Sequence, residues 1–367
     1  MIMRIVYDHQ IFSMQEYGGV SRYFYELASR IAEHEECDVS IHAPLYVNRY
    51  IQENGKFKII GVHVPRIPRT GRALTRLNDM LGRMFPLKSL PDIVHETYHS
   101  KYAATPAKAK TVITVYDMIH ERFRNLVPSR DKSSQNKECA VRRANHIICI
   151  STNTKNDLIN YFNVNPQKIS VIHLGYTLRE GLSKRKLNIG DKPYILYVGQ
   201  RYTYKNFSRL LQAYSNSPRL KKAFKLVCFG GARFSNDEIN QIKKLNLKAE
   251  DIAHFNGNDN ILRTLYANAT AFVFPSLYEG FGIPPLEAMS FKCPVVCSNK
   301  SSLPEVAGDA AEYFDPYNIE EMMLSIESVI FSTEKRNDLI EKGLKRIKLF
   351  SWEKCTEQTL EVYSSLL

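Results

Sequence analysis

The chain has 367 residues, of which 44% are hydrophobic, and this is enough to bury a large core and to form two domains. No apolar run approaches the roughly 20 residues that span a bilayer, and the chain starts on a strand-like run, so we predict an unprocessed protein without a membrane helix. The formal net charge of +12 favours anionic partners such as phosphates, acidic lipids or nucleic acid, but it does not choose among them.

Short apolar runs rich in β-branched residues alternate with helical patterns along nearly the whole sequence, as expected for parallel sheets with crossover helices. The first series of predicted strands comprises residues 4–8, 38–43, 92–97, 111–117, 146–151 and 169–175. The second series comprises residues 194–199, 225–231, 252–257, 270–276 and 294–299. The polar, charged segment 176–193 between the two series is the predicted linker.

These two series predict an α/β fold with two doubly wound, Rossmann-like domains. The predicted parts of the chain are residues 1–178, 179–350 and 351–367. The last part is expected to be a helix that packs back on the body, because a helical spacing joins Trp352, Cys355, Leu360 and Tyr363. Open sheets of this type bind ligands beyond the carboxyl ends of their strands, so two such domains facing each other are expected to form a cleft.

Two glycines follow the first predicted strand. Gly18 and Gly19 precede a helix whose apolar face carries Tyr23, Leu27 and Ile31. Glycines at a helix start let the backbone approach an anion, which the helix N-terminus favours. The dinucleotide-binding pattern G-x-G-x-x-G is absent, so a phosphate contact and a plain turn both fit this segment.

The first strand of the second series ends in "YVGQRYTYKNF", which contains Gly199, Arg201 and Lys205. Two cations in the loop after such a strand can neutralise a diphosphate, Arg201 through a two-pronged contact and Lys205 as a point charge. The alternative is that both residues are ordinary solvated charges of a loop.

The most informative stretch is "PSLYEGFGIPPLEAM", residues 275–289, which places Glu279 and Glu287 eight residues apart. Proline tolerates the first helical turn, so we predict that Pro284 or Pro285 opens a helix, with Glu279 before it and Glu287 near its first turn. Backbone amides and a helix start suit a phosphate, while carboxylates accept hydrogen bonds from sugar hydroxyls. The combination predicts a nucleotide-sugar site, although each glutamate alone has an ordinary explanation as a loop charge or a helix-start charge.

At these residues the sequence resembles retaining glycosyltransferases of family 4, whose E-x7-E motif matches Glu279 and Glu287. The resemblance extends from the Gly18-Gly19 loop to the helix at Trp352 and implies the two-domain GT-B architecture. It also implies that Glu279 contacts hydroxyls of the donor sugar and that Glu287 binds the ribose of the nucleotide.

The same resemblance assigns further roles around the donor. Arg201 and Lys205 would hold the diphosphate and stabilise charge on the leaving group. The amides of three residues would lie near the sugar, namely Gly280, Phe281 and Gly282. Such enzymes need neither a metal ion nor a cofactor, because the cations of the protein take that role.

The first half departs from the family pattern at one position. Many relatives end the strand before the mid-domain helix with a His-Asp pair, whereas here Tyr116 precedes Asp117. His120 is the candidate for contact with the transferred sugar, and His95 and His99, which lie near another strand end, are the alternatives.

Residues 66–90 raise the question of a membrane surface. Leu74, Leu77, Leu81 and Met84 recur at helical spacing, and the arginines of the segment lie on another side, namely Arg72, Arg76 and Arg83, with Arg69 and Lys88 flanking them. A basic amphipathic helix of this kind can lie in an anionic leaflet. The alternative is a helix that covers the sheet and exposes its arginines to water.

The seven cysteines are odd in number and scattered through apolar runs, which favours a reducing cytoplasm, and Cys293 and Cys297 lack partners at metal-site spacing. We therefore predict a cytoplasmic glycosyltransferase, peripheral at the inner face of the membrane, that transfers a hexose to a glycan or lipid-linked acceptor in bacterial surface polysaccharide synthesis. The resemblance favours mannose from GDP-mannose as donor, and no nucleic-acid partner is expected.

Two other classes of function remain open from the sequence. A nucleotide-sugar epimerase or a phosphorylase can share the architecture, although no lysine context for a phosphorylase cofactor is evident. A non-catalytic binder of nucleotide sugars or nucleic acid would use the basic surface. The joint presence of Glu279, Lys205 and Glu287 argues against a mere binder, because phosphate binding does not require carboxylates that face a sugar.

Overall fold

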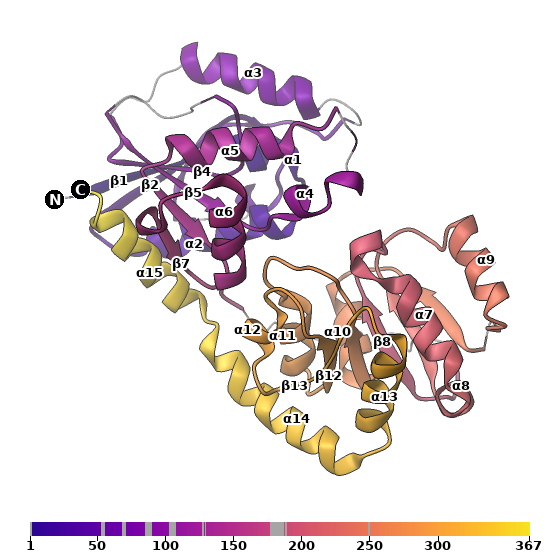
Figure 1. The fold of residues 1–367 in the computed structure, drawn as a ribbon. Helices are drawn as coiled ribbons and strands as arrows, with labels where there is room; N and C mark the ends of the chain where they lie inside the picture. The colour runs from indigo at the N-terminus through magenta and orange to yellow at the C-terminus, as the bar shows by residue number, and fades with distance from the viewer. Residues whose placement is uncertain are drawn as a thin grey trace. The chain divides into compact units, whose positions relative to one another are not determined.

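The computed structural model describes residues 2–52, 56–67, 71–84, 90–102, 108–126, 128, 130–176, 187, 189–248 and 250–367. It divides into two compact units (Figure 1). The first comprises Met1–Gly175 with Ser351–Leu367, and the second comprises Tyr176–Phe350. Most of the predicted linker, residues 177–186 and 188, lies outside the described residues.

The first unit contains a seven-stranded parallel sheet in the order β3-β2-β1-β4-β5-β6-β7. Its strands are β1 Met3–Asp8, β2 Cys37–Tyr46, β3 Lys58–His63, β4 Ile93–Glu96, β5 Lys110–Val115, β6 His146–Cys149 and β7 Ile169–Val171. The strand order reverses between β1 and β4, which is where open sheets of this kind bind ligands. Strand β4 is buried along its whole length, including His95 and Glu96, since a central strand of a parallel sheet is covered on both faces.

Helices connect these strands. They are α1 Gln10–Met14, α2 Gly19–Ile31, α3 Gly71–Met84, α4 Ile119–Arg122, α5 Ser133–Arg143 and α6 Thr152–Phe162. Helix α2 buries Tyr23, Leu27 and Ile31, which confirms the predicted apolar face. This burial fixes the start of α2, and therefore Gly18 and Gly19, just after the carboxyl end of β1.

Helix α3 contains the described part of the basic segment, and it packs against β2 and α1 through a polar residue. The buried amide of Asn78 accepts from the Leu45 N–H (2.8 Å) and donates to the Leu45 carbonyl (2.7 Å) and to Ser13 Oγ (2.7 Å). The β2–β3 register is irregular between His42 and Leu45, so Asn78 satisfies backbone groups that a regular ladder would have paired. On the outer side, Leu77 and Met80 are 40% and 52% exposed.

The C-terminal helix α15 (Trp352–Ser364) belongs to the first unit, where it packs beside α2 (Figure 1). Its buried face consists of Trp352, Cys355, Thr356, Thr359, Val362 and Tyr363. The predicted Leu360 is only half-buried, because Thr359 occupies the innermost position instead. The Tyr363 hydroxyl anchors the helix through His95 Nδ1 (2.6 Å) and the Tyr7 hydroxyl (3.2 Å).

The second unit contains a six-stranded parallel sheet in the order β10-β9-β8-β11-β12-β13. Its strands are β8 Tyr194–Val198, β9 Lys225–Phe229, β10 Ile252–Phe255, β11 Ala271–Phe274, β12 Val295–Ser298 and β13 Ala311–Phe314. The strand order reverses between β8 and β11, so the loops after these two strands flank the expected binding edge. The two parallel sheets confirm the predicted α/β fold class.

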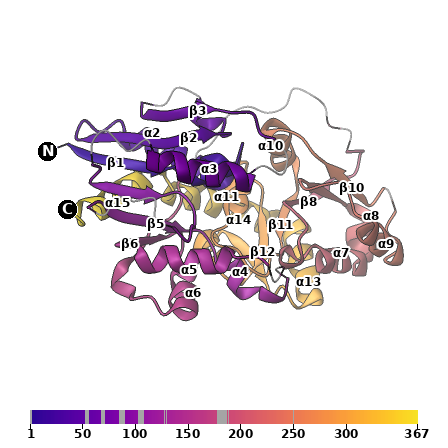
Figure 2. The same ribbon diagram turned by 90° about the horizontal axis from the view of Figure 1, so that it is seen from above.

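Two groups of helices cover this second sheet (Figure 2). In one group α7 (Phe207–Asn216) contacts α8 (Pro218–Ala223), α9 (Asn236–Lys244) and α13 (Ile319–Ile330). In the other group α11 (Ile283–Ser290) contacts α10 (Asp259–Asn268), α12 (Leu303–Ala307) and α14 (Thr333–Arg346). No helix in the described parts of the chain is both long and apolar enough to cross a bilayer.

Candidate functional site in the second unit

The loop between β11 and α11 carries Glu279, and residues after β12 hold this loop in place. The Glu279 N–H donates to Ser301 Oγ (2.9 Å). Ser302 Oγ donates to the carbonyls of Glu279 (2.9 Å) and Phe281 (2.5 Å). Gly282, with φ of +128°, gives the chain the turn that leads into α11, and this backbone conformation favours glycine. The loop is therefore fixed by its own hydrogen bonds, and the sequence motif alone did not identify the two serines.

Lys205 reaches Glu279 from the loop after β8. Its Nζ donates to Oε1 (2.7 Å) and to Oε2 (2.9 Å) of Glu279, and the two side chains are only 19% and 12% exposed. The same Nζ lies 5.4 Å from the ring centroid of Tyr204 and 5.6 Å from that of Phe274. The structure thus brings together a cation and a carboxylate at the binding edge of the sheet. A cation suits a diphosphate, and a carboxylate accepts hydrogen bonds from a sugar hydroxyl.

Glu287 lies at the start of the second turn of α11, one or two residues later in the helix than predicted. The helix begins at Ile283, before the two prolines, so Glu287 is its fifth residue and no acidic residue lies in the first turn. The Tyr266 hydroxyl donates to Glu287 Oε2 (3.2 Å), and burial together with this carboxylate raises the pKa of Tyr266 well above its usual value. The helix dipole acts mainly within the first turn, so it does not explain a glutamate at this position.

Arg201 has a different environment from the one that its sequence context suggested. Its Nε donates to Glu238 Oε1 (2.6 Å), and its terminal nitrogens donate to the carbonyls of Gly230 (3.0 Å) and Ala232 (2.5 Å). The side chain is 5% exposed and lies over the rings of Phe207 and Phe234. The guanidinium of Arg201 is therefore hydrogen-bonded within the protein, and Lys205 is the cation that contacts Glu279.

The consequence of these bonds is a fixed loop after β9. Gly230 and Gly231 both have positive φ, and the Gly230 backbone lies against Gly199 at the end of β8. Burial opposes ionisation of Glu238, but the hydrogen bonds from Arg201 and Ser235 outweigh it and hold the pKa of this carboxyl below its ordinary value. Arg201 and Glu238 thus brace the loop that adjoins the predicted phosphate site.

In the first unit, Gly18 and Gly19 lie at the start of α2 as predicted from their position. Gly18 is the N-cap of this helix and has extended backbone, and a Cβ at Gly18 would meet the side chain of Gln15. A Cβ at Gly19 would meet no atom within 4 Å. Gln15 Oε1 accepts from the Ser21 N–H (3.2 Å), which uses one amide of the first turn, and no acidic residue lies in that turn, so the helix N-terminus still favours an anion.

The three candidate histidines differ in environment. His95 is fully buried within β4, and its ring nitrogens lie 2.6 Å from the Tyr363 hydroxyl and 2.9 Å from Thr114 Oγ1. Burial lowers the pKa of His95 to about 3, so this residue belongs to the core. Burial, reinforced by Lys137, also lowers the pKa of His99 well below its usual value. By side-chain exposure, His120 in α4 and His99 are both half-buried, whereas His95 is fully buried.

A buried lysine supports the turn that carries His120. Lys137 Nζ donates to the Asp117 carbonyl (2.8 Å) and to Glu121 Oε2 (2.8 Å), and its side chain is almost completely buried. Tyr116, at the position where many relatives have histidine, is also buried, and burial raises the pKa of its phenol well above the usual value. Sequence reasoning did not identify Lys137, because a lysine in a polar helix is normally a surface residue.

Two family models match adjoining parts of the chain. The model described as Glycosyltransferase Family 4 matches residues 17–180, and the model described as Glycosyl transferases group 1 matches residues 180–346. The chain is a glycosyltransferase similar to those of family 4. The first match includes Gly18, Gly19 and the candidate histidines, and the second includes every candidate donor-site residue from Arg201 to Glu287.

Relatives and solved structures agree with this similarity. The glycosyltransferase is 29% identical to O-antigen chain mannosyltransferase B of Escherichia coli, over 95% of this chain and 96% of that protein. Its fold is similar to sucrose-phosphate synthase of Thermosynechococcus elongatus, with a TM-score of 0.77, 17% identity and 99% of both chains covered. It is also similar to Anabaena HepE in complex with UDP and glucose, with a TM-score of 0.73, 17% identity, and 99% and 100% coverage. These likenesses confirm the predicted GT-B architecture.

Proposed function

We propose that this glycosyltransferase transfers mannose from a nucleotide diphosphate donor, GDP-mannose, to a glycan or lipid-linked oligosaccharide in the synthesis of a bacterial surface polysaccharide. The contact between Lys205 and Glu279 carries the proposal, because it joins a phosphate-binding cation to a sugar-binding carboxylate at one sheet edge. The mannosyltransferase relative, which acts on the O-antigen chain and matches almost the full length, supports the choice of sugar and acceptor class.

The residues have separate roles in this proposal. Lys205 neutralises the charge that grows on the leaving diphosphate as the glycosidic bond breaks. Glu279 accepts hydrogen bonds from sugar hydroxyls, and the backbone amides beside it orient the donor, namely those of Gly280, Phe281 and Gly282. Glu287 accepts bonds from the ribose hydroxyls. Arg201 positions the loop at Gly230 and Ala232 rather than touching the phosphates.

Three further features belong to the proposal and rest on the family pattern. Transfer retains the anomeric configuration of the donor sugar, and it needs neither a metal ion nor a cofactor, since Lys205 supplies the positive charge. In the first unit, His120 is the candidate for contact with the transferred sugar, and Gly18 and Gly19 are the candidates for backbone contact with a phosphate. The enzyme acts in the cytoplasm at the inner face of the membrane, where lipid-linked acceptors are assembled.

The direct experiment is a donor panel. The protein is incubated with GDP-mannose, GDP-fucose, UDP-glucose and UDP-galactose together with a mannose-terminated lipid-linked acceptor, with and without EDTA, and the product is analysed by NMR. We expect a new α-mannoside from GDP-mannose and an unchanged rate in EDTA. Transfer from a UDP-sugar alone would replace the proposed donor, while a β-linked product or loss of activity in EDTA would contradict the proposed mechanism.

We also propose that α3 attaches the protein to anionic membranes. Leu77 and Met80 are exposed on this helix beside the exposed Arg76, whereas Arg69 and Lys88 lie outside the described residues, as do the side chains of Arg72, Arg83 and Met84. Apolar side chains with neighbouring cations suit an acidic lipid surface.

Binding to vesicles should therefore depend on lipid charge. We expect tighter binding to vesicles with 30% anionic lipid than to neutral vesicles, and weaker binding as salt is added, since each basic residue near such a surface contributes about 1 kcal/mol. A Leu77→Ser, Met80→Ser double variant should release the protein, whereas Leu324→Ser, at an exposed leucine of α13, should not. Equal binding to both kinds of vesicle would contradict the proposal and would indicate that α3 only covers the sheet.

A further inference from the structure

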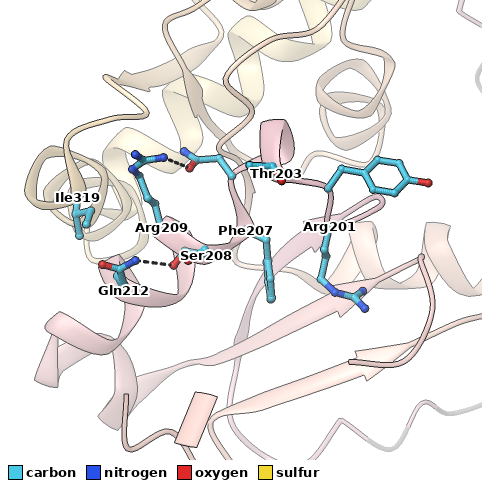
Figure 3. A pocket seen from close by; sticks show the side chains of 9 residues that line it. Arg201, Thr203, Phe207, Ser208, Arg209, Gln212 and Ile319 are labelled. Atoms are coloured by element: carbon cyan, nitrogen blue, oxygen red, sulfur yellow. Dashed lines mark hydrogen bonds between the residues drawn. The ribbon is translucent and has the colours of Figure 1, made fainter. Parts of the chain in front are cut away.

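A groove of about 600 Å³ lies in the second unit, beside α7 and the start of α13 (Figure 3). We call it the α7–α13 groove. Its lining residues are Arg201, Tyr202, Thr203, Asn206, Phe207, Ser208, Arg209, Gln212 and Ile319. Helices α7 and α13 contact each other, whereas Glu287 belongs to α11, which packs with the other group of helices. The groove therefore differs in its lining from the proposed donor site, although it borders the loop that carries Lys205.

Arg209 is held in a fixed position at this groove (Figure 3). Its Nη1 donates to Asn206 Oδ1 (3.0 Å), and its guanidinium lies 5.3 Å from the ring centroid of Tyr317. Asn206 is itself buried and fixed, because its Nδ2 donates to the carbonyls of Pro275 (3.0 Å) and Pro316 (2.7 Å). Arg209 has no carboxylate partner within the part of the chain that the structure describes, so most of its five N–H donors remain available to a ligand.

Other groups at the groove also lack protein partners. Gln212 uses its Nε2 to bond the Ser208 carbonyl (3.3 Å), and its Oε1 has no partner among the described residues. The Thr203 hydroxyl is likewise unbonded within those residues. Tyr202 and Tyr317 are 57% and 54% exposed, which is high for large aromatic side chains. The groove and its rim thus combine exposed aromatic faces with fixed donors and acceptors of hydrogen bonds.

We propose that the α7–α13 groove binds sugar units of the glycan, apart from the unit that receives the new sugar. The apolar C–H face of a pyranose ring packs on an aromatic ring, and its hydroxyls bond to arginine, amide and hydroxyl groups. The volume lies within the range of ligand pockets, about 300 to 1,000 Å³, and suits a short oligosaccharide. This inference rests on the proposed function, because it assumes that the enzyme acts on a glycan chain.

The chemistry of the lining favours a neutral glycan over a nucleotide or a phosphate. Of its two arginines, Arg201 is already neutralised by Glu238, so Arg209 supplies the only charge that lacks a carboxylate among the lining residues described. A single arginine beside exposed tyrosines provides few contacts for a diphosphate. For a sugar, the arginine provides a hydrogen-bond donor and the tyrosines provide a stacking surface.

The test measures binding without the transfer reaction. The full-length protein is titrated with α-linked mannotetraose, in the absence of nucleotide, and binding is followed by saturation-transfer NMR and calorimetry. Wild type should bind. Arg209→Ala and Tyr202→Ala should each weaken binding about tenfold, as expected for loss of a hydrogen bond to a charged group or of an aromatic contact. Arg219→Ala is the matched control, since Arg219 also lies over a ring, that of Phe331, but does not line the groove.

Kinetics then separate this inference from the proposed function. With a one-sugar acceptor the Tyr202→Ala variant should keep the wild-type kcat and KM, whereas with a long glycan acceptor its KM should rise about tenfold. No binding of mannotetraose by wild type, or equal binding by wild type and both variants, would overturn the inference even if mannosyl transfer is intact. Displacement of mannotetraose by millimolar inorganic phosphate would overturn the choice of a neutral glycan.

Discussion

Replacing Lys205 by alanine is expected to lower kcat about 100-fold or more. Negative charge accumulates on the diphosphate as the bond to the sugar breaks, and Lys205 Nζ lies 2.7 Å from Oε1 of Glu279, the carboxylate that we propose binds the sugar. An interaction that strengthens in the transition state affects kcat and kcat/KM together. The measurement is steady-state transfer from GDP-mannose at saturating acceptor, accompanied by a thermal melt.

Two further variants make this result interpretable. Lys335→Ala removes another partly buried lysine that pairs with a glutamate, Glu312 at 2.8 Å, and it should leave kcat unchanged. Arg201→Ala should behave differently from Lys205→Ala, because it leaves Glu238 without its cationic partner and three backbone carbonyls without the Arg201 donors. We expect a loss of stability of roughly 2 kcal/mol and a raised donor KM. Activity of Lys205→Ala within a few-fold of wild type, with the fold intact, would remove the proposed phosphate site.

The parallel strands were largely predictable from sequence because they are short, apolar and buried. Two strands, β3 and β13, were not predicted, and there is a physical reason for each. Strand β3 lies at the edge of its sheet, next to β2 alone, most of its residues are exposed, and Gly61 interrupts its short apolar run. Strand β13 is also an edge strand, and only its end residues, Ala311 and Phe314, are buried. Edge strands carry weaker sequence signals than central ones, since only one neighbour constrains them.

The candidate site was predictable only where its residues are close in sequence. The spacing of Glu279 and Glu287, and the two prolines between them, indicated a loop followed by a helix. Ser301 and Ser302, which hold that loop, follow the next strand, and a pair of serines gives no sequence signal for contacts 22 and 23 residues away. The same holds for Arg201, whose partner Glu238 is 37 residues away in sequence and lies in the first turn of α9.

Histidine near a strand end is a second case in which the sequence leaves alternatives open. His95 occupies a position in β4 where the side chain points into the core, toward Tyr363 of a helix that is 268 residues away in sequence. A buried histidine is acceptable there because both of its ring nitrogens have hydroxyl partners. Only the packing of the C-terminal helix distinguishes this structural histidine from one that faces a ligand.

The two glutamates of the motif should separate in kinetics. Glu287→Gln is expected to raise the KM for GDP-mannose about tenfold with little change in kcat, because a bond to ribose is similar in the ground state and the transition state. Glu279→Gln is expected to lower kcat tenfold or more, because the sugar gains positive charge as its bond breaks and the carboxylate next to it is lost. Glutamine retains the size and an acceptor oxygen in both cases, so the fold should persist.

Thermal melts decide between these roles and a purely structural one. Glu287 lies in the second turn of its helix, so the glutamine variant should melt close to wild type without ligand, but GDP should stabilise it less than it stabilises wild type. Glu279→Gln replaces a mostly buried ion pair with Lys205 by a hydrogen bond to a neutral amide, which should cost about 1–3 kcal/mol of stability, and its stabilisation by GDP should remain. If both variants melt, respond to GDP and turn over like wild type, neither glutamate binds the donor, and the nucleotide-sugar site must lie elsewhere in the protein.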